Sequence, residues 1–465
     1  MESNQPDTNQ VFLLGIGGAG QHALAEMLLD MGCRVSGSDL KLGDTALSLA
    51  QRGVKLYEGH AARNIEGATL VVTTAAAHPD NPELVEAIRR GIKVLSNAQM
   101  VAELVNQKRC LAVAGTHGKT TITNLVAGLL SKAGLDPSYY IGGSSLDLGH
   151  AGHAGQGTFS VVEADEYARR FLEYTPEAVL VTNIEADHLD YYGDFASLRA
   201  AFKQFAGKAR KIFGCADDPE ARRLAEEFKA ERGGGVYLYG LDGLADWRAV
   251  DVQPNSLGGH DFTLWQANGM LGRVSLALPG LHNVTNVVGA LGLCITLAPE
   301  VSPITFCKLV TEFKGTARRF EVKGEVNGVT VVDDYAHHPS EIKATLAAAR
   351  ARYKGRRLVA VFQPHTYSRT KALLDDFAKA FAGADVVALL EIFPARETDT
   401  LGVSSGDILG RMQHPGKQAE VLTLTNAAEA LRKILQPGDV LLTLGAGDVW
   451  KIGQELLNNG SNGRN

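Results

Sequence analysis

A loop that reads Ala-Gly-Thr-His-Gly-Lys-Thr-Thr at 114–121 could bind phosphate. It follows an apolar run at 110–113 and precedes a helix-like run at 122–130. Backbone N–H groups at the glycines and at the helix N-terminus would surround phosphate oxygens, Lys119 would add a cation, and Thr120 could ligate Mg²⁺. The sequence therefore predicts a site for ATP or a related nucleotide. Val113 stands where the strict G-x-x-x-x-G-K-[ST] pattern requires glycine, so the loop is a shortened variant.

Metal-competent side chains follow two apolar strands, which we predict at 159–162 and 179–181. Glu163 comes directly after the first strand, where a carboxylate could hold Mg²⁺ against the phosphate loop. His188 ends the run Asn-Ile-Glu-Ala-Asp-His after the second strand, and we expect it to be a metal ligand. Solvated loop acids are the alternative interpretation of the first run, and a structural histidine is the alternative for the second.

A second glycine-rich loop, at 15–20, reads Gly-Ile-Gly-Gly-Ala-Gly and lies between a predicted strand and a predicted helix. Asp39 follows about 20 residues later, after a strand at 34–37, which completes a dinucleotide-binding fingerprint. Glycines beside a helix N-terminus can receive any pyrophosphate, including that of a UDP-sugar, so NAD is only one candidate ligand. A tight turn without a ligand is the alternative.

Two polar pairs could contact a nucleotide. Asn283 and Asn286 open a helix and could hydrogen-bond adenine, whereas helix capping by Asn283 is the alternative. Arg318 and Arg319 lie near a predicted domain junction and could bridge to ATP phosphates. Paired arginines that only cover a surface are the alternative there.

Two dense polar clusters follow strands in the last third of the chain. They read Asp-Asp-Tyr-Ala-His-His-Pro at 333–339 and Gln-Pro-His-Thr-Tyr-Ser-Arg-Thr at 363–370. Ligands gather at the carboxyl ends of strands in open α/β sheets. We therefore expect these clusters to recognise a small charged substrate.

Strands alternate with helices in three successive series, which predicts parallel sheets covered by helices. Short segments at 261–266 and 272–278, parted by Gly and Asn, predict a small antiparallel insert. The expected fold class is α/β with three domains: a Rossmann-like domain at 1–106, a central P-loop domain with the insert at 107–314, and a second Rossmann-like domain at 315–465.

Composition excludes several classes of protein. A net charge of -6 gives no electrostatic footprint for nucleic acid. The five cysteines lack C-x-x-C spacing, so we expect buried thiols in a reducing cytosol. The polar N-terminus has no apolar signal region, and no run of about 18 apolar residues occurs. We predict a cytoplasmic monomer or weak dimer that does not span a membrane, with a disordered tail at 458–465.

In this order, the motifs resemble those of the Mur ligase family over essentially the whole chain. The resemblance rests on the phosphate loop, Glu-Ala-Asp-Glu-Tyr, Asn-Ile-Glu-Ala-Asp-His, His-Asn-Val-Thr-Asn and the two C-terminal clusters. It implies that the first domain holds UDP-N-acetylmuramate, that the central domain is an ATPase, and that the last domain closes over the site and admits L-alanine. It also implies that the loop at 15–20 binds the UDP-sugar rather than NAD.

By this resemblance the lactyl carboxylate of the sugar attacks the ATP γ-phosphate, and the amine of L-alanine then attacks the acyl phosphate. The implied catalytic residues are Lys119, Glu163, His188, His337 and Arg369. The implied ATP contacts are Gly115, Thr116, His117, Gly118, Lys119, Thr120, Thr121, Asn283, Asn286, Arg318 and Asp334. The implied UDP-sugar contacts are Gly15, Gly17, Gly18, Ala19, Gly20, Asp39, His60 and Thr74, and the implied alanine contacts are Tyr335, His337 and Arg369. Thr120 and Glu163 would hold one Mg²⁺ and His188 a second.

The chain departs from the family pattern at two positions. Many similar chains carry Arg where this one has Thr366, so amino-acid recognition would depend more on Arg369. Phe202 occupies the position at which several family members carry a carbamylated lysine, so we predict no carbamate. A family member that joins a preformed peptide, an NAD-dependent oxidoreductase and a noncatalytic nucleotide switch remain alternatives.

Overall fold

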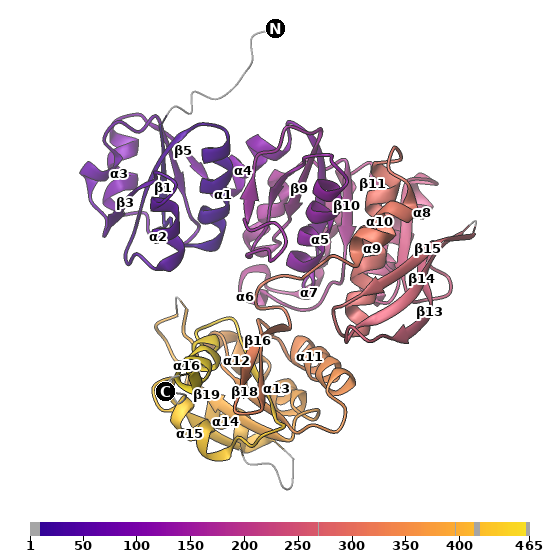
Figure 1. Ribbon diagram of the computed structural model, residues 1–465. Coiled ribbons are helices and arrows are strands. Elements are labelled where there is room, and N and C mark those ends of the chain that lie inside the picture. The colour runs from indigo at the N-terminus through magenta and orange to yellow at the C-terminus, as the bar shows by residue number, and fades with distance from the viewer. Residues whose placement is uncertain (1–9, 268, 396, 413–418, 462–465) are drawn as a thin grey trace. The chain divides into compact units, whose positions relative to one another are not determined.

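The computed structural model describes residues 10–267, 269–395, 397–412 and 419–461 (Figure 1). These residues form two compact units. The first unit comprises the described residues up to Val250 together with Thr263–Val274 and Thr285–Phe313. The second comprises Asp251–Phe262, Ser275–Val284 and the described residues from Lys314 onward. The first unit contains the first sheet and most of the second, and both glycine-rich loops lie in it.

The first sheet has five parallel strands in the order β3-β2-β1-β4-β5. Its strands are β1 (Gln10–Leu14), β2 (Arg34–Asp39), β3 (Lys55–Glu58), β4 (Leu70–Thr73) and β5 (Lys93–Ser96). Its helices are α1 (Ala19–Asp30), α2 (Asp44–Ala50), α3 (Pro82–Arg89) and α4 (Asn97–Val105), with the 3-10 turn η1 (Ala62–Ile65). The strand order reverses between β1 and β4. Ligands of open parallel sheets bind at such a point, beyond the carboxyl ends of the strands.

The second sheet has ten strands in the order β15-β14-β13-β12-β11-β10-β6-β9-β7-β8. The strands are β6 (Arg109–Ala114), β7 (Ser138–Tyr140), β8 (Gly152–His153), β9 (Phe159–Glu163), β10 (Ala178–Val181), β11 (Lys211–Cys215), β12 (Val236–Gly240), β13 (Trp247–Pro254), β14 (His260–Gln266) and β15 (Gly269–Leu276). The helical segments are α5 (Lys119–Lys132), η2 (Tyr167–Glu173), α6 (Leu189–Tyr192), α7 (Phe195–Gly207), α8 (Pro219–Arg232), α9 (Leu281–Leu297) and α10 (Pro303–Val310). The strands from β12 to β7 pair in parallel.

The predicted insert extends this sheet instead of standing apart from it. Strand β13, which the sequence analysis did not predict, pairs in parallel with β12 through Tyr239 and Trp247. Strands β14 and β15 are neighbours joined by two residues, a connection too short for a parallel crossover, so they run antiparallel. Trp247 is fully buried, and its burial anchors the insert to the central core.

The third sheet has the order β16-β17-β21-β18-β19-β20 and is parallel except for the edge strand β16. Its strands are β16 (Glu321–Val326), β17 (Val329–Asp334), β18 (Leu358–Phe362), β19 (Val386–Leu390), β20 (Ala419–Leu422) and β21 (Val440–Leu444). Its helices are α11 (Pro339–Arg352), α12 (Tyr367–Ala372), α13 (Leu374–Ala380), α14 (Ser405–Arg411), α15 (Ala427–Ile434) and α16 (Trp450–Ser461). Alternate residues of β18 enter two separate cores, one on each face of the sheet.

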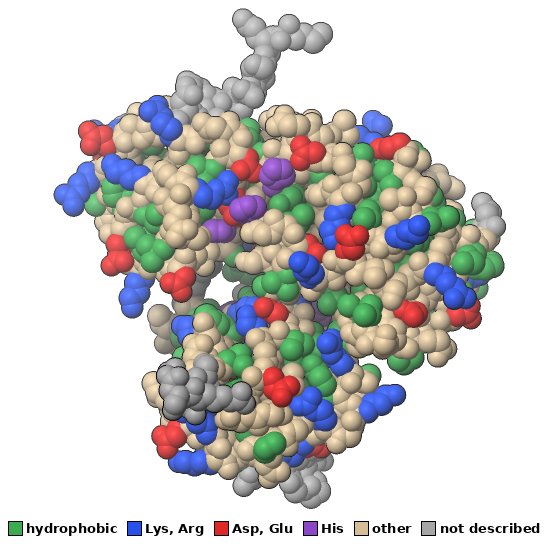
Figure 2. Space-filling view, in the orientation of Figure 1, with side chains coloured by type: hydrophobic (Ala, Val, Ile, Leu, Met, Phe, Trp, Pro, Cys, Tyr) green, Lys and Arg blue, Asp and Glu red, His purple; other side chains and the backbone are tan. Residues whose placement is uncertain are grey.

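The predicted α/β class with three sheet-containing regions is confirmed. Helix α16 continues to Ser461, so the tail predicted to be disordered from 458 is helical up to that residue, and 462–465 lie outside the described residues. No helix in the described part of the chain is long and apolar enough to cross a membrane. On the face shown in Figure 2, acidic and basic side chains are interspersed and do not gather by sign.

Candidate nucleotide and substrate sites

The central glycine loop joins β6 to α5 at the carboxyl edge of the second sheet. Gly115 has a φ of +137°, and a Cβ there would lie 1.9 Å from Thr182 Oγ1. Gly118, the N-cap of α5, has a φ of +81°. L-residues with side chains rarely adopt either conformation, so the backbone itself requires both glycines. The partial positive charge of the α5 N-terminus therefore lies directly at the loop.

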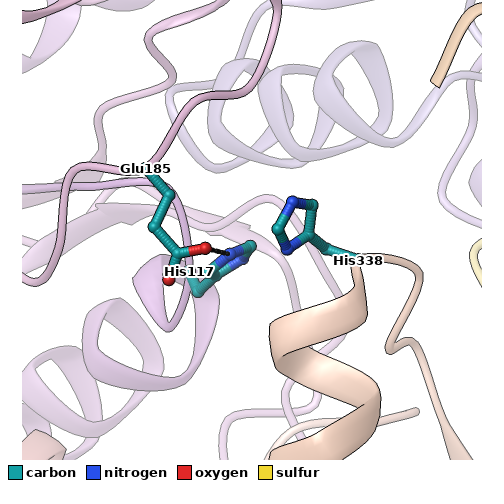
Figure 3. A group of neighbouring side chains, drawn as sticks. All are labelled: His117, Glu185 and His338. Atoms are coloured by element: carbon teal, nitrogen blue, oxygen red, sulfur yellow. Dashed lines mark hydrogen bonds and ion pairs between the residues drawn. The ribbon is translucent and has the colours of Figure 1, made fainter. Parts of the chain in front are cut away.

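Residues after β10 hold this loop in shape. Asn183 accepts the N–H of His117 with its side-chain Oδ1 at 2.8 Å and the N–H of Thr116 with its carbonyl at 3.0 Å. Thr182 Oγ1 donates to the carbonyl of His117 at 2.6 Å. Figure 3 shows that His117 also faces Glu185, with 3.3 Å between Nε2 and Oε2. The start of the polar run after β10 thus supports the phosphate loop.

Lys119 is held by a buried carboxylate. Its Nζ lies 2.8 Å from Glu166 Oε2 and donates to the carbonyls of Thr116, at 3.0 Å, and Gly115. Burial acts to lower the pKa of Lys119, but the carboxylates of Glu166 and Asp165 outweigh burial and raise that pKa above its usual value. Lys119 therefore remains an ammonium at the start of α5.

Two predicted metal ligands lie in contact. Thr120 Oγ1 donates to Glu163 Oε1 at 2.9 Å, and the other oxygen of Glu163 accepts the N–H of Gly142 at 2.7 Å. A hydroxyl beside a carboxylate is a donor set that fits a hard cation such as Mg²⁺. The third predicted ligand, His188, contacts Asp187 at 3.7 Å and packs at a tilt against Tyr167, with 5.0 Å between ring centroids. Its role as a ligand stays a prediction.

The N-terminal glycine loop joins β1 to α1, which begins at Ala19 after Gly18. The N–H of Gly15 donates to the carbonyl of Ser38 at 2.8 Å, and the N–H of Gly17 donates to Asp39 Oδ2 at 2.9 Å. A Cβ at Gly15 would lie 2.8 Å from Thr74 Cγ2. The loop thus fits between the ends of β2 and β4, at the point where the strand order reverses. In this position Asp39 supports the backbone of the loop.

His60 lies after β3, and its side chain is 18% exposed. Its Nδ1 is 2.9 Å from Oε2 of Glu83, whose side chain is completely buried, and 3.1 Å from Ser38 Oγ. Since the carbonyl of Ser38 also binds the loop at Gly15, His60 belongs to the same network as the N-terminal glycine loop.

Two residues predicted to contact ATP support the edge of the third sheet. Arg318 Nε donates to Asp333 Oδ2 at 3.0 Å. Asp334 accepts the N–H groups of Phe320 and Ala336, each at 2.8 Å, and burial raises the pKa of its carboxyl to about 6. These contacts hold both side chains in place at the edge of the third sheet, and their contact with ATP stays a prediction.

The two C-terminal clusters meet at the carboxyl edge of the third sheet. The ring centroid of His337 lies 5.3 Å from that of Tyr335 and 5.9 Å from that of His365. Burial lowers the pKa of His337 to about 3; Glu341 opposes that shift and Arg369 adds to it. His337 is therefore neutral near pH 7. Because its Nδ1 lies 3.0 Å from the carbonyl of Tyr335, that nitrogen carries the proton.

The two asparagines predicted to recognise adenine differ in their surroundings. Asn286 Oδ1 lies 3.2 Å from the position of a Cβ on Gly118, beside the phosphate loop. Asn283 lies in the first turn of α9 and its Nδ2 donates to the carbonyl of Pro279 at 2.8 Å. This contact ties Asn283 to the turn before the helix, and its contact with adenine stays a prediction.

The positions that depart from the family pattern have structural roles. Phe202 is fully buried and packs edge to face on Phe171, with 5.3 Å between ring centroids. Thr366 is the N-cap of α12 and accepts the N–H of Arg369 at 3.4 Å. Thr366 therefore positions the helix that carries Arg369.

Neither Glu83 nor Glu166 was predicted as a site residue from the sequence. Glu83 occupies the first turn of α3, and an acid there is usually an exposed partner of the helix dipole. Glu166 was one of several acids in a single run after β9. Their complete or nearly complete burial depends on long-range packing, which no local pattern encodes.

Three family models match successive stretches of the chain. They describe a Mur ligase family catalytic domain at residues 10–109, a Mur ligase middle domain at 113–294, and a Mur ligase glutamate ligase domain at 318–447. Together they include both glycine-rich loops and both C-terminal clusters.

Relatives and solved structures match the chain over nearly its full length. The UDP-N-acetylmuramate--L-alanine ligase of Geobacter sp. (strain M21) is 43% identical over 455 residues, covering 96% of this chain and 97% of that protein. The protein of the same name from Salinibacter ruber is 41% identical over 460 residues, covering 97% and 95%. The crystal structure of the UDP-N-acetylmuramate-alanine ligase MurC from Thermotoga maritima has a TM-score of 0.83 at 26% identity, covering 98% of this chain and all of that one. A murein peptide ligase from Psychrobacter arcticus has a TM-score of 0.72 at 27% identity, covering 97% and 99%. The chain belongs to the Mur ligase family.

Proposed function

We propose that this chain is an ATP-dependent ligase that joins the amino group of L-alanine to the lactyl carboxylate of UDP-N-acetylmuramate, a step in the synthesis of peptidoglycan precursors. The observation that carries the proposal is the presence of two glycine-rich loops, each after the first strand of its own sheet. One loop is suited to the diphosphate of the UDP-sugar and the other to the phosphates of ATP. An NAD-dependent oxidoreductase would need only the first loop. The names of the relatives from Geobacter and Salinibacter support the same activity.

The chemistry follows from the weakness of a carboxylate as an acyl donor. An oxygen of the lactyl carboxylate attacks the γ-phosphorus of ATP, and ADP leaves. The amine of L-alanine then attacks the carbonyl carbon of the acyl phosphate, and phosphate leaves with the former carboxylate oxygen. Lys119 would stabilise the negative charge on the transferring phosphoryl group, because its ammonium lies at the start of the helix that follows the loop.

Thr120 and Glu163 would hold Mg²⁺, and His188 would ligate a second ion. The 2.9 Å contact between Thr120 Oγ1 and Glu163 Oε1 supports this assignment, because oxygen ligands suit Mg²⁺. When bound, the ion supplies charge neutralisation for the phosphoryl group. Adenine is assigned to Asn283 and Asn286, and further ATP contacts to Arg318 and Asp334.

The alanine carboxylate is assigned to Arg369, because a planar guanidinium matches a carboxylate in two hydrogen bonds. Tyr335 and His337 would line the rest of the pocket. With a pKa of about 3, His337 can accept a hydrogen bond but is too weak a base to take the proton of the amine at neutral pH.

We propose domain limits of 1–106, 107–314 and 315–465 and a cytoplasmic location, where ATP is available.

Phosphate release by the purified protein tests the proposal. Mg-ATP and UDP-N-acetylmuramate are supplied with L-alanine, glycine, L-serine or a tripeptide that begins with L-alanine. We expect L-alanine to stimulate release most strongly and the tripeptide to have little effect. Stimulation by none of them would contradict the proposal, and preference for the tripeptide would indicate a ligase for preformed peptides.

A further inference from the structure

The buried carboxylate of Glu83 is the centre of a hydrogen-bond network in the first sheet. Its Oε2 accepts from Ser38 Oγ at 2.7 Å and from His60 Nδ1 at 2.9 Å. Its Oε1 accepts from Asn64 Nδ2 at 2.7 Å and from the N–H of Ala61 at 3.4 Å. Four polar groups thus surround this carboxyl group, although its side chain has no exposed surface.

Helix α3 fixes this carboxylate in place. Asn81 caps the helix and accepts the N–H of Glu83 at 2.9 Å. Glu83 therefore lies in the first turn of α3, where the helix dipole favours negative charge. The position is rigid, because Pro82 opens the helix and Ala87 on the same helix is fully buried.

The network ends at the N-terminal glycine loop. Ser38, which donates to Glu83 through its hydroxyl, accepts the N–H groups of Gly15 and Ile16 through its carbonyl, at 2.8 and 3.0 Å. Glu83 thus fixes both the end of β2, on which the loop rests, and the imidazole of His60. With Nδ1 bound to Glu83, the other ring nitrogen of His60 is the one that can meet a ligand.

We propose that Glu83 is a positioning residue for the uridine-diphosphate portion of the substrate, acting through His60. This inference rests on the proposed function, because it takes the loop at 15–20 as the site of a UDP-sugar. Oxygen Oε2 of Glu83 contacts both Ser38, at the end of β2, and the partly exposed imidazole of His60. A carboxyl group that only stabilised the fold would not need this shared contact. Glu83 itself touches no ligand, since it is fully buried.

Calorimetric binding of UDP and of UDP-N-acetylmuramate tests this role. Glu83→Gln keeps the shape but replaces an acceptor oxygen with an amide donor, so we expect Kd for both ligands to rise about tenfold. His60→Asn should cause a similar rise. In the double variant the rise should stay near tenfold instead of reaching about a hundredfold, because both changes remove one interaction. In the ligase assay, KM for the UDP-sugar should rise with little change in kcat.

Glu86→Gln is the matched control. It makes the same substitution on the same helix, but Glu86 pairs with Arg89 and Arg90 of that helix and not with His60 or Ser38, so Kd should not change. If Glu83→Gln does not fold, Glu83→Asp keeps the buried charge, shortens its reach, and should also weaken binding. Unchanged Kd in a folded Glu83 variant, or multiplicative effects in the double variant, would overturn this inference and leave the proposed function intact. Absence of UDP-sugar binding by the wild-type protein would overturn both.

Discussion

Lys119 lies where α5 begins, between the carbonyls of its own loop and the carboxylate of Glu166. We predict that Lys119→Ala lowers kcat about 100-fold or more, because loss of one preorganised charge contact to the phosphoryl group costs roughly 3 kcal/mol. Binding of UDP-N-acetylmuramate, measured by calorimetry, should change by less than about twofold, since that ligand is assigned to the first sheet.

Lys132→Ala is the control for this substitution. Lys132 ends the same helix, away from the loop, and pairs with Asp147 and Glu312, so its removal should leave kcat nearly unchanged. Loss of UDP-sugar binding in folded Lys119→Ala would show that one site serves both nucleotides, contrary to the two-site account.

His337 gives the second unit a pH dependence with a definite sign. Its pKa is about 3 when folded, against an ordinary value of 6.5, so between these pH values the unfolded chain binds more protons than the folded one. The stabilisation is complete above pH 6.5 and declines as the pH falls toward 3. At pH 5 the wild type should have lost about 2 kcal/mol relative to pH 8 through this group.

The free energy of unfolding is measured by urea titration at pH 8 and at pH 5. Hydrogen exchange of the amides in β17 and β18 reports on the second unit specifically. His337→Gln should remove that share of the pH dependence. His282, whose pKa burial lowers to about 4, is present in both proteins and cancels in the comparison. An equal loss of stability in wild type and variant would show that His337 is not neutral in the folded state.

For single residues, the sequence predicted which side chains lie near each other. It did not predict which of them hydrogen-bond to one another or to the backbone of the loops. The contact of Thr120 with Glu163 could be predicted, because each follows a strand of one parallel sheet. Asp39, in contrast, binds the N–H of Gly17. A carboxylate near a glycine loop gives the same sequence signal whether it binds a ribose or the loop itself.

The element that most directly controls the ATP site is the turn between β6 and α5. In Gly115→Ala the new Cβ would lie 1.9 Å from Thr182 Oγ1 and 3.0 Å from the carbonyl oxygen of Asn183, in a backbone conformation with a φ of +137°. We predict a loss of ATP affinity of at least tenfold, because the loop must move away from the end of β10. Calorimetry with a nonhydrolysable ATP analogue measures this change.

Gly128→Ala is the matched control within α5. Among the described residues, no atom outside the neighbouring backbone of the helix lies within 4 Å of a Cβ at that position, and alanine favours a helix by up to about 1 kcal/mol. The variant should bind the analogue normally and melt at the same temperature or a higher one. Normal ATP affinity in Gly115→Ala would contradict the close approach of the loop to β10.

At the element scale, strands with continuous apolar runs were predicted accurately, because a parallel sheet buries both of their faces. Strand β18, with all five residues buried, shows this pattern. Strand β13 was missed because only part of it is buried, at Trp247 and Ala249, and because its parallel partner β12 is recognisable only in three dimensions. The insert therefore joins the central sheet instead of forming a separate one.

At the scale of the whole molecule, three sheets carry three separate groups of polar residues at their carboxyl edges. The order of these groups along the chain was visible in the sequence, since each follows a predicted strand, and the Mur ligase models match in the same order. The grouping into compact units was not visible in the sequence. Residues 251–262 and 275–284 belong to the same unit as the C-terminal residues, although they lie within the predicted central domain.

In the proposed reaction, ATP activates the lactyl carboxylate before the amine attacks. The most direct test uses UDP-N-acetylmuramate with both oxygens of that carboxylate labelled with ¹⁸O, together with ATP, Mg²⁺ and L-alanine. Each phosphate released should carry one ¹⁸O, detected by mass spectrometry, and the amide carbonyl of the product should keep the other. Unlabelled phosphate formed together with the amide product would contradict the account.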